Sequence, residues 1–400
     1  MSSTATVRRR RVFYIPGYDP IPPRRYRELY RKEGAEQSLI SSYSINVLKA
    51  KTDVTYGWRV EALIDDVTVE TEMSVLVWSD IVKHSMDRGI LATYRQLVHT
   101  VMVYVGSGAL FRLMRLRKGP VIAALYPVGS LIVQLALALA AAWGAGRMLG
   151  LVHPLAAWAG LGVVPILLLW FRRQDKRVFV YYLMHDYAHA ASHQGAYSPD
   201  LEARLAVFAD HVAEALAQDF EEVLIVGHSS GAHLAVSVLA DLIRSGRVPQ
   251  GGPALALLSL GQVVPMVSFL PRADRLRADL ALLSACDALT WVDVNAPGDG
   301  CAFALCDPVS VSGVAPPNKR WPLVISAAFT QTLSPARWRA VRWRFFRLHF
   351  QYLCAFDRPG DYDYFRITAG PLTLGARFMD RSPSKSRIED ATSGYTSLRP

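Results

Sequence analysis

The sequence predicts an α/β fold, in which helices cover both faces of a mostly parallel sheet and a hairpin of two membrane-spanning helices is inserted. The first observation is that short apolar runs rich in β-branched residues alternate with amphipathic segments along most of the 400 residues. Such alternation is typical of parallel sheets with helices on both sides. The second observation is that residues 121–171 carry a single charge. This stretch is long enough for two helices that cross a bilayer.

The individual elements follow from the same patterns. Strands are expected at residues 11–15, 57–63, 74–77, 222–226, 254–260 and 288–294. Helices are expected at residues 24–33, 200–218, 231–244, 273–284 and 335–348. Gly34 is expected to end the first of these helices, because glycine commonly follows the last turn of a helix.

This order divides the chain into four parts. Residues 1–87 form the N-terminal part of the sheet domain and begin with a basic arm, residues 1–10. Residues 88–177 form the membrane insertion, and residues 178–379 form the main part of the domain. The tail, residues 380–400, is polar and poor in apolar side chains, so we expect it to be disordered.

One strand-like run ends in a serine flanked by glycines. Residues 223–231 read Val-Leu-Ile-Val-Gly-His-Ser-Ser-Gly, and a helix rich in small residues follows. A G-x-S-x-G motif in this setting places its serine, here Ser229, at the tight apex of a strand-to-helix turn. Gly227 and Gly231 leave room where a Cβ would collide with the crossing backbone. Ser229 is therefore the candidate nucleophile, and an ordinary structural turn is the alternative.

This motif and its setting resemble the nucleophile elbow of the α/β-hydrolase family, and the resemblance covers residues 11–20 and about 178–370. It implies a Ser–His–acid triad that cleaves an acyl ester through an acyl-enzyme, with no cofactor and no metal. In that family the acid and then the histidine follow the serine along the chain. Of the two histidines after Ser229, His233 lies one turn along the same helix and points away, which leaves His349 as the base. A helix-end histidine packed among aromatic residues is the alternative interpretation of His349.

Three aspartates are candidates for the acid that orients the histidine. Asp299 lies in a Pro-Gly-Asp-Gly loop just after a late strand, the place where acids of this family usually lie. Asp293 lies inside that strand, and Asp307 lies in a second loop. Asp299 is favoured for its loop position, although a plain turn residue would also suit that sequence.

The same resemblance implies two backbone N–H groups that hold the oxyanion. Ser230, the residue after the nucleophile, supplies the first. Members of the family take the second from a loop after an early strand, and here strand 11–15 is followed by Pro-Gly-Tyr-Asp-Pro. Gly17 lets this backbone approach closely, and the N–H of Tyr18 is the candidate second donor. The loop departs from the His-Gly form of many lipases, and an ordinary Pro-Gly turn is the alternative.

The membrane spans are expected at about residues 121–145 and 149–171, joined by a glycine-rich connector at residues 144–150. Two buried helices of a soluble core are the alternative. Basic residues flank both spans: Arg112, Arg115, Arg117 and Lys118 before the first, and Arg172, Arg173, Lys176 and Arg177 after the second. The positive-inside rule then places both flanks and both termini in the cytoplasm.

The segment before the first span, Ile90–Leu116, carries apolar residues at helical spacing and arginines towards its ends. We expect a helix that lies on the anionic inner leaflet. An amphipathic helix that faces the protein core is the alternative.

Composition narrows the class of partner. The net charge of +10 would suit nucleic acid, but no nucleic-acid-binding motif is present and the membrane flanks account for much of the excess. Residues 335–347 interleave arginine with tryptophan and phenylalanine, a pattern that suits phospholipid headgroups or an anionic substrate as well as a solvated helix face.

The four cysteines have no metal-ligand spacing and fit reduced cytosolic thiols. The basic arm has no apolar segment ahead of the first strand, so no secretion signal is expected.

These features together predict a membrane-anchored serine hydrolase, esterase- or lipase-like, with the bilayer and an acyl-ester or lipid substrate as its partners. Ser229 Oγ and a ring nitrogen of His349 are expected within hydrogen-bond reach of each other. Two alternatives stay open. An acyltransferase would use the same triad with an alcohol in place of water, and a catalytically silent membrane scaffold would keep only the fold.

Overall fold

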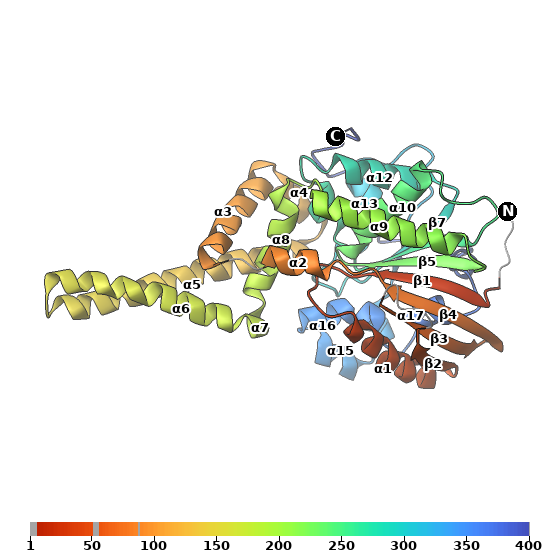
Figure 1. Cartoon of the computed structure of the whole chain (residues 1–400), viewed down its shortest axis with the longest axis horizontal. Helices are drawn as coiled ribbons and strands as arrows, with labels where there is room; N and C mark the ends of the chain where they lie inside the picture. Colours follow the sequence, from red (N-terminus) through yellow and green to blue (C-terminus); the bar gives the residue numbers. More distant parts are fainter. Residues whose placement is uncertain (1–5, 51–55, 87–88, 400) are drawn as a thin grey trace.

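The computed structural model describes residues 6–50, 56–86 and 89–399. It confirms the predicted α/β class: an eight-stranded, mostly parallel sheet has helices on both faces, and a long helical hairpin projects from one end of the domain (Figure 1). The predicted boundary at residues 87–88 and the first five residues of the basic arm lie outside the described residues.

The sheet has the strand order β2-β3-β4-β1-β5-β6-β7-β8. Strands β1 and β4 to β8 run parallel to one another, whereas β3 is antiparallel to both β2 and β4. Every residue of β5 is buried, which explains its unbroken apolar run. The strands are β1 (Arg9–Ile15), β2 (Ser44–Lys49), β3 (Gly57–Ile64), β4 (Val67–Val75), β5 (Glu222–His228), β6 (Ala254–Leu260), β7 (Leu289–Asn295) and β8 (Leu323–Ser326).

Alternate side chains of these strands feed two separate cores, one on each face of the sheet. The first face packs against α2 (Ser79–Met86), α9 (Pro199–Leu216), α10 (Gly231–Arg244) and α12 (Asp274–Ala285). The second face packs against α1 (Arg24–Ser41), α15 (Pro335–Val341), α16 (Phe345–His349), α17 (Tyr364–Ala369) and α18 (Leu374–Arg377). The shorter elements are α11 (Val264–Ser268), α13 (Pro308–Val311), α14 (Phe329–Thr332) and η2 (Phe350–Leu353).

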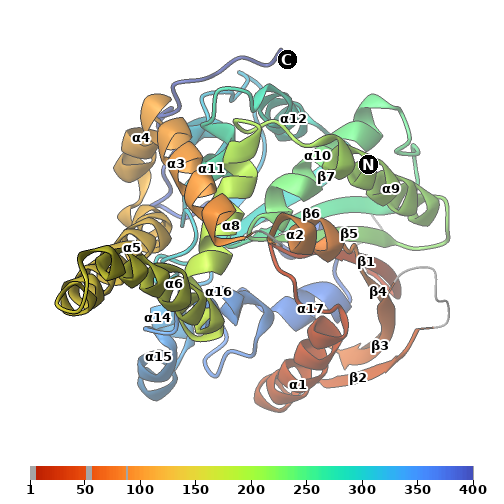
Figure 2. The ribbon, with the colours of Figure 1, turned by 60° about the vertical axis from the view of Figure 1, so that its left-hand side comes forward.

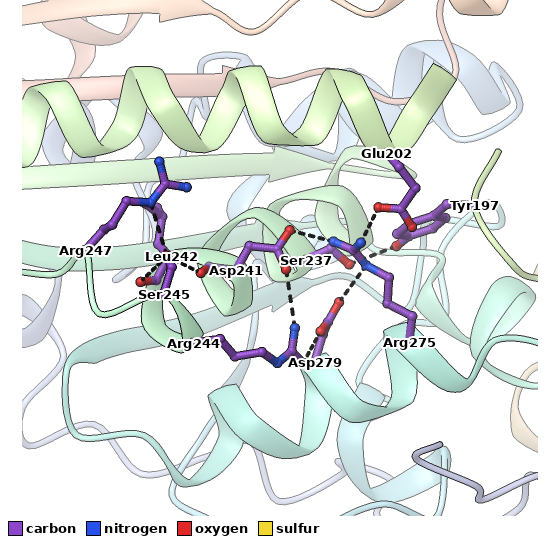
Figure 3. A network of polar contacts seen from close by, with 10 residues as sticks. All are labelled: Tyr197, Glu202, Ser237, Asp241, Leu242, Arg244, Ser245, Arg247, Arg275 and Asp279. Atoms are coloured by element: carbon purple, nitrogen blue, oxygen red, sulfur yellow. Dashed lines mark hydrogen bonds and ion pairs between the residues drawn. The ribbon is translucent and has the colours of Figure 1, made fainter. Parts of the chain in front are cut away.

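A polar network joins α9, α10 and α12 (Figure 3). Arg275 of α12 donates hydrogen bonds to Glu202 of α9 and to Asp241 of α10, the latter at 2.6 Å. Arg244 of α10 donates to Asp279 of α12, whose side chain is fully buried. The buried carboxylate of Asp279 therefore has arginine partners on both α10 and α12, and Arg275 also ties α12 to α9, so the network holds the three helices together.

Among the residues that the structure describes, two helices are long and apolar enough to cross a membrane, by length and composition. The first is α5 (Lys118–Gly150), and the second combines η1 (Pro154–Gly162) with α6 (Val163–Arg173). The predicted connector at residues 144–150 is wrong, because α5 continues to Gly150 and the turn falls at residues 151–153. A Cβ at Gly146 would lie 2.8 Å from the backbone of η1. The glycines therefore let two helices pack closely, as small residues do in membranes, and do not form the turn.

The segment before the hairpin is two helices, α3 (Ile90–Gly106) and α4 (Ala109–Leu116), which meet at an angle of 72°. The single helix expected over residues 90–116 breaks at Gly108, whose φ of +72° favours glycine. One side of α3 packs against α8 (Val180–Ser192), which follows the short helix α7 (Asp175–Val178). The other side exposes apolar residues, namely Leu91, Val98, Met102 and Val105.

Three local expectations within the domain are also wrong, the first being the strand expected at residues 74–77, because β4 covers Val67–Val75. Helix α1 continues past Gly34 to Ser41, because the missing side chain at Gly34 makes room for the ring of Phe365, 3.2 Å from where a Cβ would lie. The helix expected at residues 335–348 is two helices, α15 and α16, separated by residues 342–344. Strands β2 and β8 were not among the predicted strands.

The expected disorder of the tail is wrong as well. Residues 380–399 lie against the domain through backbone hydrogen bonds. The N–H of Ile388 donates to the carbonyl oxygen of Leu305 at 2.7 Å, and its carbonyl oxygen accepts from the N–H of Asp307 at 2.9 Å. At the other end, β1 takes in two residues of the expected basic arm, and the buried Arg10 pairs with Glu222 at 2.5 Å.

Candidate active site

Ser229 lies at the turn between β5 and α10, at the carboxyl edge of the sheet. Its φ is +56°, in the left-handed region that residues other than glycine rarely adopt. Its N–H donates a hydrogen bond of 2.9 Å to the carbonyl oxygen of Leu260 at the end of β6. A Cβ at Gly227 would lie 2.7 Å from the backbone of α10, and one at Gly231 would lie 2.1 Å from the carbonyl oxygen of Ile15. The two glycines therefore allow the crossing that this strained turn requires.

The loop after β1 lies directly over this turn. A Cβ at Gly17 would lie 2.9 Å from Cβ of Ser229 and 3.3 Å from its Oγ. The indole N–H of Trp78 donates to the carbonyl oxygen of Pro16 at 2.9 Å, which holds the loop in place. Only a residue without a side chain fits at position 17, so the backbone comes close to the serine hydroxyl.

The two candidate oxyanion donors border the same space. Tyr18 follows Gly17 and Ser230 follows Ser229, and both Tyr18 and Ser230 line one cavity. The hydrogen bonds found among the described residues leave the backbone N–H groups of both unused. Two free N–H groups beside a serine hydroxyl are what an oxyanion hole requires.

His349 lies at the end of α16 and pairs with Asp299 in the loop after β7. Nδ1 of His349 lies 2.7 Å from Oδ2 of Asp299, and both side chains are buried. The same carboxylate accepts hydrogen bonds from the hydroxyl of Tyr352 at 3.1 Å and from the N–H of Cys301 at 2.9 Å. Burial alone would raise the pKa of Asp299, but the His349 ring and these hydrogen bonds together lower it. The carboxylate is therefore ionised and holds the His349 ring in one orientation.

The other two candidate acids have structural partners. Asp293 accepts hydrogen bonds of 2.5 Å from Ser259 and from Asn295, and burial raises its pKa to about 7. Asp307 accepts backbone hydrogen bonds at the start of α13, and Nζ of Lys319 lies 2.6 Å from its Oδ2. The structure thus places Asp299 against His349 and gives Asp293 and Asp307 other contacts.

Ser229 and His349 line the same cavity, but the expected hydrogen bond between them is not formed. Nε2 of His349 is buried and has no hydrogen-bond partner within the part of the chain that the structure describes. Because Nδ1 is held by Asp299, Nε2 is the nitrogen left to accept a proton. Catalytic hydrogen bonds are often long before a substrate binds.

Four further histidines line the cavity, His189, His193, His228 and His233, and burial keeps His228 and His233 neutral. His228, inside the motif, donates from Nε2 to the carbonyl oxygen of His349 at 3.0 Å, and its pKa is lowered to about 3, mainly by burial. His233 also lines the cavity, although we expected it to point away. Its Nδ1 shares a hydrogen bond of 3.0 Å with the hydroxyl of Tyr197, and burial lowers its pKa to about 3. Tyr197 also contacts Ser237, so the network of Figure 3 reaches the cavity wall.

The cavity has a volume of about 790 Å³, within the range of small-molecule sites. It is bordered by residues from the sheet domain and from the insertion. Most of its walls are apolar or aromatic and include Trp78, Tyr104, Ile122, Ala123, Tyr126, Phe179, Leu183, Met266, Val267 and Phe346. An acyl group therefore suits its walls better than a strongly polar ligand.

Asp186 of α8 is a carboxylate in this cavity that sequence reasoning missed. Burial raises its pKa to about 7, although the charge of His349 opposes the shift. In the sequence, an aspartate in the middle of an amphipathic helix looks the same whether it faces a cavity or solvent. His228 was equally missed, although it stands inside the motif itself.

Asp299, Cys301 and His349 are also the one group of possible metal ligands found among the described residues, with their ligand atoms within 4.8 Å of one another. Burial raises the pKa of the Cys301 thiol well above its usual range, so the thiol is protonated and a poor ligand. Asp299 and His349 already bond each other. The group therefore fits a hydrogen-bonded pair better than a metal centre. No family model, curated protein or solved structure matches the chain.

Proposed function

We propose that this protein is a serine hydrolase of the α/β-hydrolase type that cleaves acyl esters at a membrane. The observation that carries the proposal is that the strained turn at Ser229 borders the same cavity as His349, whose ring is held from behind by Asp299. Three segments distant in the sequence thereby bring a hydroxyl, an imidazole and a carboxylate together near the carboxyl edge of a parallel sheet, where ligands of α/β proteins bind.

In the proposed reaction, Oγ of Ser229 attacks the acyl carbonyl carbon while Nε2 of His349 takes the hydroxyl proton. Asp299 keeps the imidazole in the tautomer with its proton on Nδ1 and stabilises the imidazolium that forms. The N–H groups of Ser230 and Tyr18 hold the negative charge that develops on the carbonyl oxygen.

The tetrahedral intermediate then collapses, the ester C–O bond breaks, and the leaving alkoxide takes the proton from His349. Water enters, gives a proton to His349, and its oxygen attacks the acyl carbon. Collapse of the second intermediate breaks the bond to Ser229, and His349 returns the proton to the serine oxygen. One ester and one water thus give one acid and one alcohol.

The proposed location is a membrane in which α5 and α6 form two spans. The basic residues that flank the two spans support, by the positive-inside rule, a cytoplasmic location for both soluble parts. In Figure 1, α3, α4, α7 and α8 gather where the hairpin leaves the domain, so this end would face the bilayer. The exposed apolar residues of α3 then meet the lipid surface.

Covalent labelling tests the proposal directly. Membranes that contain the full-length protein are treated with a fluorophosphonate probe, which reacts with activated serines. The wild type and Ser245→Ala, a control at the far end of α10, should label equally, and Ser229→Ala should not label. Equal labelling of Ser229→Ala, or no labelling of a folded wild type, would overturn the proposal. No labelling of a folded wild type would favour a catalytically silent scaffold.

A further inference from the structure

We propose that the substrate is an anionic membrane lipid whose acyl chain passes from the bilayer along α5 into the cavity at Ser229. This inference rests on the proposed function and on the proposed membrane location of the hairpin. It names the substrate class, the path of entry and the residues that select the headgroup. The overall reaction is hydrolysis, in which the lipid ester and water give a free fatty acid and a lipid alcohol.

An apolar path leads from the span to the cavity along α5. Between Lys118 and Arg147 this helix carries no charged residue. Its first turns supply part of the cavity wall through Ile122, Ala123 and Tyr126. Ile122 is 64% exposed and Tyr126 44% exposed, whereas His349, which lines the same cavity, is only 6% exposed. The cavity therefore opens along the side of α5 and leads inwards to the proposed catalytic residues.

The length of α5 sets the height of this opening in the bilayer. The helix has 33 residues, whereas about 20 residues span the hydrocarbon core of a bilayer. Counted back from Gly150, such a span ends near Leu131. The turns that line the cavity then lie at the level of the headgroups, where the ester groups of a lipid also lie. A lipid ester can therefore reach the cavity without leaving the membrane.

Basic side chains border the opening. Arg177, just after the second span, and Arg344, just before α16, are both exposed and both line the cavity. In the described part of the chain neither has an ion-pair partner, unlike the nearby Arg347, which pairs with Glu33. Two unpaired guanidinium groups beside an apolar passage suit a phosphate or another anionic headgroup.

Aromatic side chains complete the opening. Trp343 is 72% exposed and Phe345 is 54% exposed, next to Arg344 in the chain. Phe346 packs against Phe179 beside α7, with ring centroids 4.5 Å apart, so this segment lies at the base of the hairpin (Figure 2). Exposed aromatic and basic residues together are typical of membrane interfaces. The occupant that fits this surface is a lipid, because a soluble ester needs neither the apolar path nor the aromatic rim.

The acid loop meets the same end of α5. A Cβ at Gly119 would lie 3.2 Å from the carbonyl oxygen of Gly300, next to Asp299. Arg117 donates to the carbonyl oxygen of Ala304 at 2.8 Å. The first turn of α5 is therefore fixed against the loop that contains Asp299. The passage along α5 and the proposed catalytic residues are thereby held in one position relative to each other.

The first test blocks the path. Ala123→Trp places a large ring in the passage, and Ala136→Trp places the same ring on an exposed position of the same helix, away from the cavity. Full-length protein in mixed micelles is supplied with a long-chain phosphatidylglycerol or with a water-soluble acetyl ester. The turnover of lipid relative to acetyl ester should fall about tenfold or more in Ala123→Trp and should stay at the wild-type value in Ala136→Trp. If the Ala123→Trp variant does not fold, the same measurement is made on Ala123→Phe.

The second test concerns the headgroup. Phosphatidylglycerol and phosphatidylcholine with the same acyl chains are compared in the same micelles. The wild type and Lys176→Gln, an exposed neighbour that does not line the cavity, should prefer the anionic lipid. In Arg177→Gln/Arg344→Gln the ratio of the two rates should fall towards one.

These outcomes separate the lipid inference from the proposed function. If the wild type reacts with the fluorophosphonate and cleaves the acetyl ester but not the lipid, the lipid inference is wrong and the hydrolase proposal stands. An unchanged rate ratio in both Ala123 variants would overturn the entry path, and an unchanged headgroup preference in the arginine variant would overturn the assigned headgroup. If neither ester is cleaved and the probe does not react, the proposed function itself fails.

Discussion

Nδ1 of His349 lies 2.7 Å from Oδ2 of Asp299, although fifty residues separate them in the chain. Asp299 follows β7 and His349 ends α16, so the contact joins the edge of the sheet to a helix that packs over it. A hydroxyl of Tyr352 and a backbone N–H complete the partners of the carboxylate. The pair therefore has the geometry with which an acid fixes the tautomer and orientation of an imidazole.

The first prediction separates this acid from its neighbours. Asp299→Asn should lower turnover of a short-chain ester by about 10⁴ while the fold is kept, because the imidazole loses its orienting partner. Asp293→Asn should act mainly on thermal stability, because its carboxylate accepts hydrogen bonds from Ser259 and Asn295. Purified variants in detergent are compared for turnover and thermal unfolding, with Asp307→Asn alongside. A folded but inactive Asp293→Asn next to an active Asp299→Asn would reverse the assignment.

The second prediction concerns the loop over Ser229. Gly17→Ala should lower turnover by about 10², the effect of losing one oxyanion donor, because the new methyl group would lie 2.9 Å from Cβ of Ser229 and push the loop away. The matched control is Gly106→Ala at the end of α3, where a Cβ meets nothing within 4 Å. Turnover of a short-chain ester is measured for both. Normal turnover in Gly17→Ala would show that the loop does not contribute to the site.

The third prediction concerns the effect of pH on stability. Burial raises the pKa of Asp186 to about 7, well above the value of about 3.9 in an unfolded chain. Between these two values the folded protein keeps a proton that the unfolded chain releases, so this group makes stability fall as the pH rises through that window. Above it, the contribution levels off.

Asp186→Asn removes that titration and provides the test. The thermal midpoint of the wild type minus that of Asp186→Asn should fall between about pH 5 and about pH 8. Taking the difference removes the contributions that other groups make to the pH dependence of both thermal midpoints. One such group is Asp293, because burial raises its pKa to about 7 as well. A difference that stays constant with pH would contradict the assigned environment of Asp186.

The fourth prediction concerns the orientation in the membrane. In a background without the four native cysteines, Val152→Cys at the turn of the hairpin should react with an impermeant maleimide on intact cells. Val152 is 85% exposed, so the protein itself does not shield it. Lys385→Cys in the exposed part of the tail should react only after the membrane is opened. The opposite pattern would reverse the topology inferred from the basic flanks.

The sequence was most informative where structure depends on nearby residues. Strand β6 begins and ends where its apolar run does, and the turn at Ser229 follows from the two glycines that flank it. Contacts between distant segments could not be read in this way. Choosing Asp299 over Asp293 and Asp307 required the position of α16, and Asp186 became visible only once α8 was placed beside the cavity.

The wrong predictions have the same origin. Gly34 sits within a helix because Phe365, over three hundred residues away, fills the space beside it. The tail is ordered because its backbone bonds to residues such as Leu305, which composition does not reveal. The helix expected at residues 335–348 breaks at residues 342–344, just before the segment in which Phe346 packs against Phe179. Local propensity was outweighed by tertiary contacts at each of these places.

The most direct test of the central proposal is to identify the residue that the fluorophosphonate modifies. Purified full-length protein is labelled, digested and analysed by mass spectrometry, with His349→Ala labelled under the same conditions. The proposal predicts one adduct, on Ser229, and a strongly reduced rate of its formation in His349→Ala. An adduct on another residue, or none on a folded wild-type protein, would contradict the assignment of Ser229 as the nucleophile.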